Sequence, residues 1–325
     1  MDNLMRVARL HGVADLRLTE EETPEVGPGM SLVRVTAVGL CGSDLHWYAE
    51  GGIGDATITR PLVVGHEFAG VVEGGPAHGR RVAVDPAIPC ESCRSCRSGY
   101  RNLCPNIRFA GHDLLDGGLR ELIAWPTELL HALPDHVSDS DGAMLEPLGV
   151  ALHAFDLGHL HLGGTVAVVG CGPIGLLLIQ LARLAGASTV IAVEPLPHRA
   201  EAAKRFGAVL AEDAQADVVF EVAGNDAAVN TSLELARPGG RVVLVGIPDD
   251  DRTTFRASLA RRKGLTLALV RRMNDVYPRA IRLVEEGKVD VASLVSARYP
   301  LAEAPAAFTA AIRREGLKTV IEPQR

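Results

Sequence analysis

Aromatic side chains are scarce in this sequence. Phe, Trp and Tyr make up 4% of its 325 residues, whereas hydrophobic residues of all kinds make up 47% and charged residues 22%. This balance is sufficient for a packed interior and excludes disorder throughout the chain. The cores must therefore rest on Val, Leu, Ile and Ala, and the length suits two domains of ordinary size.

The chain also lacks an excess of positive charge, since its formal net charge is −7. Proteins that bind nucleic acids or anionic membranes usually present a basic surface. The acidic balance therefore argues against both partners and against a zinc-finger-like nucleic-acid module. It says little about the substrate.

No targeting or membrane-spanning segment is evident. The opening residues, MDNLMRVARLHG, have no apolar core of the kind found in signal peptides. Residues 162–182 carry no charge, but they contain five glycines and one proline. This stretch indicates a strand, a glycine turn and a helix rather than a membrane span. We expect a soluble, cytoplasmic protein.

Four of the six cysteines form the pattern C-x2-C-x2-C-x7-C, as Cys90, Cys93, Cys96 and Cys104. In a chain without a secretion signal, such clustering points to metal binding rather than to disulfides. Four thiolates in one loop can close around a structural zinc ion. An iron–sulfur cluster is the alternative because Pro105 follows the last cysteine, but the ferredoxin motif requires a shorter final gap. Zinc is therefore favoured.

The two halves of the chain differ in pattern. Short strand-like runs at 31–40, 61–65 and 80–86 indicate an irregular β domain within the first 150 residues. Apolar strands and helices then alternate, which predicts a doubly wound parallel sheet. The expected strands are 165–170, 188–194, 217–224, 241–247 and 265–269, and the expected helices are 174–186, 197–207, 226–236 and 275–287. A last helix and strand follow in the tail.

A G-x-G-x-x-G sequence follows the first of these apolar strands and opens a helix, which is the context that a dinucleotide fingerprint requires. Gly170 permits the tight turn, Gly172 lets the backbone approach a pyrophosphate, and Gly175 lets helix and strand pack closely. Pro173 and Ile174 complete the turn. The free N–H groups of the helix N-terminus then face the phosphates.

Glu194 ends the next strand, nineteen residues beyond Gly175. A carboxylate at this position can accept hydrogen bonds from both ribose hydroxyls and repels a 2′-phosphate, so NAD is favoured over NADP. Arg199 weakens this preference because an arginine could hold that phosphate.

A second set of metal-binding residues is spread over the first half. Cys41, His66 and a carboxylate together supply the mixed ligands of a catalytic zinc site, which keeps one position open. Glu67 and Glu146 compete for the carboxylate position, and the sequence does not choose between them.

The segments CGSDLHWY, GHEFAG, LEPLGVALHA, VVGCGPIGLL and RYPL, together with the four cysteines, occur in one order along the chain. In this the chain resembles the zinc-containing medium-chain dehydrogenases, most closely their polyol branch of sorbitol, xylitol and L-idonate dehydrogenases. The resemblance implies a GroES-like catalytic domain with the zinc sites at 1–150, a Rossmann NAD-binding domain at 151–289, and a C-terminal segment, 290–325, that returns to the first. It places the active site between the domains and implies a homo-oligomer, either a dimer or a tetramer.

The resemblance also assigns roles to residues at the metal. It places the catalytic zinc on Cys41, His66 and Glu67, with Glu146 either a further ligand or hydrogen-bonded through water. Asp44 would orient His66.

Further roles follow from the same resemblance. Ser43 is the hydroxyl expected to take the substrate proton, and His46 passes it towards solvent. The expected substrate-pocket residues are Trp47, Tyr48 and Arg298, the last of which would bind polyol hydroxyls or Glu146. The expected contacts to the nicotinamide are Ala223, Val245 and Ile247, with Gly224 and Gly246 beside them.

The chain departs from the family pattern in two places. The turn after Gly70 is shorter, and only nine residues separate Gly207 from Asp217, where a strand and a helix are usual. The adenine-side edge of the sheet is therefore uncertain from sequence.

These observations predict a zinc-dependent enzyme that moves a hydride from a secondary alcohol, most plausibly of a polyol, to NAD. L-threonine and simple alcohols are alternative substrates. A non-enzymatic zinc- and dinucleotide-binding sensor is the alternative from another class, and it would not need an open metal site beside a hydroxyl relay.

Overall fold

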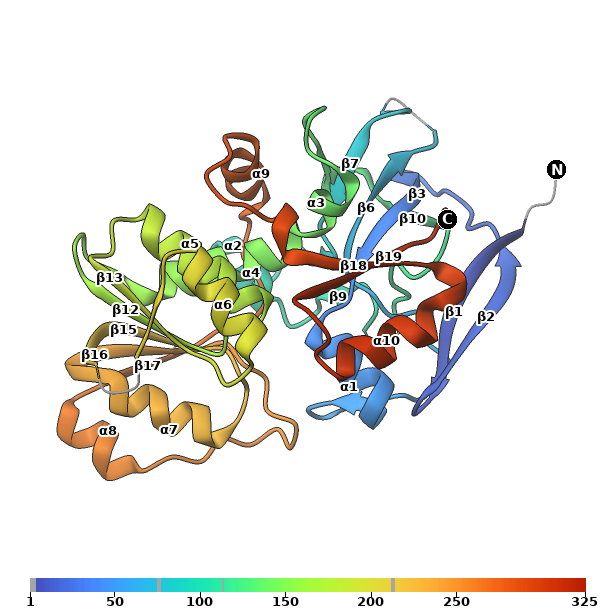
Figure 1. The fold of residues 1–325 in the computed structure, drawn as a ribbon. Helices are drawn as coiled ribbons and strands as arrows, with labels where there is room; N and C mark the ends of the chain where they lie inside the picture. The colour runs from blue at the N-terminus through green and yellow to red at the C-terminus, as the bar shows by residue number, and fades with distance from the viewer. Residues whose placement is uncertain (1–3, 75–76, 113, 212–213) are drawn as a thin grey trace. The chain divides into compact units, whose positions relative to one another are not determined.

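The computed structural model describes residues 4–74, 77–112, 114–211 and 214–325 (Figure 1). The chain divides into two compact units, and each is described here by itself. The first unit comprises Met1–Glu146, Tyr277–Glu285 and Val291–Arg325, and the second comprises Pro147–Val276 and Glu286–Asp290.

The first unit is built on a seven-stranded sheet. Its strands run in the order β11-β7-β6-β3-β19-β18, and β10 pairs with β3 off this path. Their bounds are β3 Met30–Gly39, β6 Glu67–Val72, β7 Arg81–Val84, β10 Leu122–Pro126, β11 Leu130–Ala132, β18 Val295–Pro300 and β19 Lys318–Glu322. The shorter pairs are β1 Leu4–Gly12 with β2 Asp15–Glu22, β4 Gly52–Ile53 with β5 Ala56–Thr57, and β8 Ala87–Ile88 with β9 Arg108–Phe109.

The tail of the chain supplies two strands of this sheet. β19 runs antiparallel to β3, and β18 runs parallel to β19, so the red C-terminal strands in Figure 1 lie beside the blue β3. The helices of this unit are α1 Gly42–Glu50, α2 Arg94–Arg97, α3 Asp139–Ala143, α9 Tyr277–Glu285 and α10 Ala304–Ile312, with short 3-10 turns at Arg101–Leu103, Thr127–Leu129, Ala292–Leu294 and Leu301–Glu303.

The second unit contains a six-stranded, wholly parallel sheet in the order β14-β13-β12-β15-β16-β17. This is the order of a doubly wound Rossmann sheet, as predicted. The strands are β12 Thr165–Val169, β13 Thr189–Val193, β14 Val209–Leu210, β15 Ala216–Glu221, β16 Ala236–Leu244 and β17 Thr266–Leu269. The helices are α4 Leu145–Gly158, which begins at the end of the first unit, α5 Pro173–Leu184, α6 Pro197–Arg205, α7 Asp226–Leu235 and α8 Ala257–Lys263.

Helices cover both faces of this sheet. α5 and α6 pack on the strands from one side, and α7 and α8 pack on them from the other (Figure 1). The core between these layers consists of small and branched aliphatic side chains, such as Ala167, Ile191, Val219 and Val242. The expectation that the cores rest on Val, Leu, Ile and Ala is met in this cluster, whereas the core of the first unit also contains four buried aromatic side chains, Trp47, Phe68, Trp125 and Phe308. The central strands β12, β13 and β15 are largely apolar because both of their faces are buried, whereas β14 and β17 at the two edges of the sheet are partly exposed.

One predicted strand is wrong. Residues 61–65 form no strand, and only Leu62 makes a bridge, to Leu10. Gly65 has φ +94°, outside the extended region, and the loop at 116–119 takes the hydrogen bonds of residues 63–65. The strand begins two residues later, at Glu67.

The edge that the sequence left uncertain is a short strand. β14 pairs with Ile191 and Ala192 of β13, so the order of the sheet is complete at this edge. Among the residues described between β14 and β15 there is no helix, which accounts for the short spacing from Gly207 to Asp217.

In the part of the chain that the structure describes, every helix is too short or too polar to cross a membrane. Residues 162–182 form β12, the glycine turn and most of α5, as the glycine and proline pattern predicts.

Candidate metal centres and dinucleotide turn

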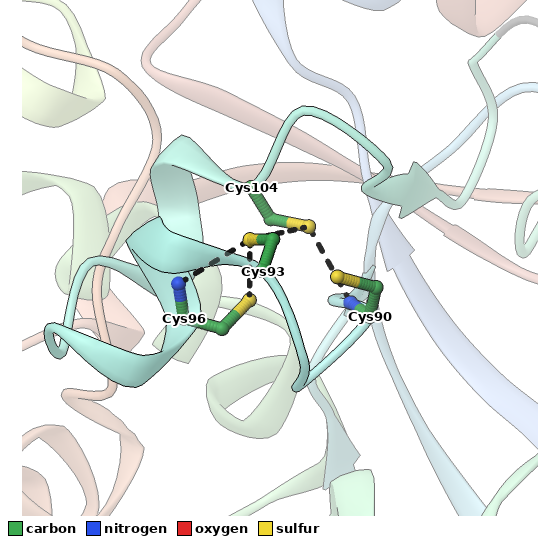
Figure 2. A group of neighbouring side chains, drawn as sticks. All are labelled: Cys90, Cys93, Cys96 and Cys104. Carbon is green, nitrogen blue, oxygen red and sulfur yellow. Dashed lines mark hydrogen bonds between the residues drawn. The ribbon is translucent and has the colours of Figure 1, made fainter.

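The four clustered cysteines converge on one point. Their sulfur atoms all lie within 4.8 Å of one another. Sγ of Cys93 is 3.4 Å from Sγ of Cys96 and 3.9 Å from Sγ of Cys104, and Figure 2 shows Cys90 completing the group. Zinc–sulfur bonds of about 2.3 Å in a tetrahedron separate the sulfurs by about 3.8 Å. The spacing therefore fits a closed, four-thiolate zinc site.

Backbone N–H groups support these sulfurs. The N–H of Cys90 donates to Sγ of Cys104, and the N–H of Cys96 donates to Sγ of Cys93. Both N···S distances are 3.4 Å. Hydrogen bonds from Ser92 lower the pKa of Cys90 to about 5, whereas burial and the neighbouring thiols raise that of Cys96 to about 12. Because thiolates this close repel one another, all four can ionise only with a cation among them.

A second group of possible metal ligands lies in the first unit. Cys41, His66 and Glu67 each offer one donor atom, and these atoms lie within 4.8 Å of one another. Cys41 caps the N-terminus of α1 just after β3, while the other two lie at the start of β6. Antiparallel pairing of β3 and β6 sets Gly39 opposite Glu67, which brings these distant parts of the sequence together. Thiolate, imidazole and carboxylate fit an open, catalytic type of zinc site.

Asp44 holds this group in place. Its Oδ1 lies 3.4 Å from Nδ1 of His66 and accepts the N–H of Gly65 at 3.0 Å, while Oδ2 accepts the N–H of Cys41 at 3.0 Å. Burial raises the pKa of Asp44, but His66 and the two N–H groups outweigh burial and lower it. A carboxylate on Nδ1 leaves Nε2 as the ring nitrogen available to an ion.

Lys318 is a member of the site that the sequence did not reveal. Its Nζ forms an ion pair with Oε2 of Glu67, and the two side chains are only 3% and 2% exposed. Gly39 makes room for this pair, because a Cβ there would collide with the Glu67 carboxylate. The available signal was a lysine among the apolar residues of a C-terminal strand, KTVIE, since Lys is rarely buried without a partner.

The two candidate carboxylates occupy different places. Glu67 belongs to the 4.8 Å group with Cys41 and His66, and Glu146 does not. Burial raises the pKa of Glu146 to about 7, opposed by His66 and reinforced by the carboxylate of Glu67. Glu146 is therefore a buried carboxyl group beside the ligand set.

The two residues that the sequence proposes as a proton relay lie on α1. Ser43 is half-buried in the first turn of the helix, next to Asp44. Nδ1 of His46 lies 3.1 Å from Oε1 of Glu50, one helical turn further on. Both residues therefore lie on the helix that Cys41 caps at its N-terminus.

The three predicted pocket residues have different surroundings. Trp47 is 1% exposed and packs in the core with its ring edge against His112, so a core role is favoured over a pocket role. The ring of Tyr48 lies against Phe308, with centroids 4.9 Å apart. Arg298 is exposed, and its ion pair is with Glu322 at 3.6 Å rather than with Glu146.

The glycine turn in the second unit has the expected form. Gly170 has φ +95°, and a Cβ at Gly175 would overlap the carbonyl oxygen of Gly170. Both glycines are therefore required by the fold. Pro173 begins α5, where its missing N–H costs nothing, and Ile174 follows it.

Glu194 contacts the same turn. Its Oε2 accepts the N–H of Cys171 at 2.7 Å, and its Oε1 accepts the N–H of Leu196 at 2.9 Å. Each oxygen keeps a further lone pair for a ribose hydroxyl. A guanidinium nitrogen of Arg199 would lie 3.6 Å from a Cβ at Gly172. The arginine that could hold a 2′-phosphate therefore also lies beside the glycine turn.

The residues predicted to meet the nicotinamide follow β15 and β16. Ala223 and Ile247 are exposed, and Val245 is half-buried. A buried acid that the sequence did not reveal, Glu221, ends β15 directly before them.

Comparison with known families covers both halves of the chain. The model described as the alcohol dehydrogenase GroES-like domain matches residues 27–135, and the model described as zinc-binding dehydrogenase matches residues 173–286.

Relatives match almost the whole chain. Sorbitol dehydrogenase of Bacillus subtilis (strain 168) is 31% identical, over 99% of this chain and 98% of the relative. The structure of L-idonate 5-dehydrogenase from Escherichia coli has a TM-score of 0.92 at 29% identity and covers 98% of each chain. A structure from Sinorhizobium meliloti 1021, described as a zinc-binding dehydrogenase bound to NADP, has a TM-score of 0.91 at 32% identity, over 98% of this chain and 99% of that one.

Proposed function

Because this chain belongs to the zinc-binding alcohol dehydrogenases, we propose that it oxidises a secondary alcohol of a polyol to a ketone with NAD as the hydride acceptor. The convergence of Cys41, His66 and Glu67 is the observation that carries the proposal. Zinc would supply Lewis acidity that acidifies an alcohol and polarises a ketone, and NAD would take the hydride. Polyol relatives such as sorbitol and L-idonate dehydrogenases support the substrate class.

The protein's own residues would hold the zinc and carry the proton. We propose Cys41, His66 and Glu67 as its ligands, with Glu146 joined through water, since only Glu67 lies within the ligand group. Ser43 would accept the alcohol proton and His46 would pass it on, with the ring held by the contact to Glu50.

The choice of NAD over NADP rests on Glu194. Its carboxylate is fixed at the glycine turn by two backbone N–H groups, where it would repel a 2′-phosphate. Arg199 lies beside the same turn and opposes this preference, and one relative is bound to NADP. The first assay therefore compares the rates of reduction of NAD and of NADP.

A reduction screen tests the proposal. Polyols, sugar acids, threonine and simple alcohols are each offered with NAD and with NADP, and absorbance of the reduced ring is followed. We expect the fastest reaction with a polyol and NAD. Preference for threonine or a simple alcohol would overturn the substrate class. No reduction with any alcohol, by protein that retains zinc, would support the non-enzymatic sensor instead.

The assembly is also a proposal. The dimer or tetramer implied by the family resemblance is tested by light scattering on the eluted protein, and a mass equal to one 34.4 kDa chain would contradict it.

A further inference from the structure

Three neighbouring strand ends of the second unit meet backbone to backbone. β12, β15 and β16 are adjacent in the parallel sheet, so their carboxyl ends lie at the same edge. A Cβ on Gly170, after β12, would lie 3.0 Å from the N of Ala223, after β15. A Cβ on Gly224 would lie 2.5 Å from the carbonyl oxygen of Ile247, after β16. The glycine turn and the two later loops therefore form one continuous, tightly packed platform.

Glu221 lies directly under this platform. It is the last residue of β15, is 1% exposed and pairs in register with Val169 on one side and Leu244 on the other. Its Oε1 accepts the N–H of Ala223 at 2.8 Å and that of Gly224 at 2.7 Å.

The same residue also holds the third strand end. The backbone oxygen of Glu221 accepts the N–H groups of Val245 and Gly246 at 2.8 and 3.1 Å. A Cβ on Gly246 would lie 2.9 Å from Oε2 of the carboxylate, so the backbone passes directly over this oxygen. Burial raises the pKa of Glu221, while the N–H groups of Gly224, Ala223 and Gly246 oppose that rise by favouring the carboxylate.

We propose that Glu221 is a positioning residue that shapes the platform under the nicotinamide half of the dinucleotide. The proposal rests on the proposed function, because the residues that Glu221 fixes are those expected to meet the nicotinamide. Without the carboxylate, the N–H groups of residues 223 and 224 lose their acceptor, and the loop that ends β15 can leave its position against Ile247. These two hydrogen bonds are partly buried, so the loss of their acceptor is costly and the loop is expected to rearrange.

The structure predicts that loss of the Glu221 carboxylate weakens binding of the nicotinamide half of the dinucleotide only. Glu194, which would hold the ribose, accepts the N–H groups of Cys171 in the glycine turn and of Leu196 before α6, so its position does not depend on a bond to Glu221. Binding of NADH should therefore weaken while binding of ADP-ribose, which lacks the nicotinamide, should not.

The test compares NADH and ADP-ribose by calorimetry on the purified full chain. In Glu221→Ala we expect NADH affinity to fall at least about tenfold, and in Glu221→Gln about threefold, because the amide keeps one acceptor oxygen. ADP-ribose affinity should stay within about twofold in both. If Glu221→Ala does not fold, Glu221→Gln carries the test by the same comparison.

Asp217→Asn is the matched control. Asp217 lies at the opposite end of β15 and accepts the N–H of Thr165 at 2.7 Å, so it makes a similar bond away from the platform. We expect this variant to treat NADH and ADP-ribose alike. Equal weakening of both ligands in the Glu221 variants, or no change in either, would overturn the inference. Failure of the unaltered protein to bind NADH would instead overturn the proposed function.

Discussion

A few buried charged side chains surround the group of Cys41, His66 and Glu67, and each of them can be tested singly. Asp44 is 0% exposed and lies against His66. Its contact with Nδ1 fixes the orientation of the His66 imidazole. Carboxylates in this position typically contribute 10- to 100-fold to metal affinity.

We therefore expect Asp44→Asn to weaken binding of one of two zinc ions by about 10- to 100-fold, measured by competition with a chromophoric chelator. Asp116→Asn is the control, because Asp116 is a partly buried acid that pairs with Arg9 instead. Unchanged affinity for both ions in Asp44→Asn would show that Asp44 does not support the metal.

Lys318 and Glu67 depend on each other because both are buried. Removing one partner of a buried ion pair leaves the other charge uncompensated, at a cost of about 3–5 kcal/mol. With zinc removed by a chelator, so that no metal compensates Glu67, we expect Lys318→Met to lower the free energy of unfolding by this amount in urea titrations. Arg17→Met breaks an exposed pair with Asp15 and should change little. Equal unfolding midpoints for the two variants would contradict the role of Lys318.

The sequence alone left Glu67 and Glu146 as alternatives for the carboxylate, and only the family resemblance placed Glu67 on the zinc. Cys41 and His66 could be named as candidate ligands from their residue types and flanking motifs. Lys318 and Glu221 could not, because their contacts depend on the register of β19 with β3 and of β15 with β16. Strand pairing determines which side chains are buried at these two positions, and a single sequence does not specify that pairing.

Helices and strands whose hydrophobic pattern is strong lie where the sequence predicts them. Those whose pattern is weak do not. The apolar runs of the second unit alternate with helical patterns, so a doubly wound parallel sheet and the approximate bounds of β12, β13, β15, β16 and β17 could be predicted, but the short edge strand β14 could not. Residues 61–65 were misassigned because an apolar run resembles a strand even when a neighbouring loop takes its hydrogen bonds.

The glycine turn gives a prediction at this scale. Gly172 has φ −67°, and the nearest atom to a Cβ there is 3.6 Å away, so the fold does not require glycine. We expect Gly172→Ala to keep its melting temperature but to bind NADH about tenfold more weakly, because the added methyl group blocks the pyrophosphate. Gly175→Ala, which overlaps the backbone of Gly170, should lower the melting temperature itself. Normal NADH affinity in Gly172→Ala would contradict the assignment.

The start of β15 gives a pH prediction. The N–H of Thr165 and the guanidinium of Arg237 lower the pKa of Asp217. The stability that Asp217 contributes is therefore present above its unfolded-state pKa, about 3.9, and is lost as the pH falls through the lower folded-state value. We expect the melting temperature of Asp217→Asn to fall less than that of the unaltered protein on acidification. Parallel profiles for the two proteins would contradict this linkage.

At the scale of the whole molecule, the sequence specified the classes of structure and the likeness to a family. The cysteine spacing and the change of pattern near residue 160 predicted a β part with metal sites and a parallel α/β part. The family resemblance implied that residues 290–325 return to the first part, and β18 and β19 do belong to the first unit; the structure adds that α9 belongs to it as well. Such a return is a property of tertiary packing, which local patterns do not report.

The central claim is that Cys41, His66 and Glu67 share one zinc ion while the four clustered cysteines hold another. Zinc content per chain, measured by mass spectrometry on the purified protein and on Cys41→Ala, tests it most directly. Cys171→Ala is the control, since that buried thiol belongs to neither group. We expect two zinc ions per chain in the unaltered protein and the control, and one in Cys41→Ala. Two ions retained in Cys41→Ala would contradict the account.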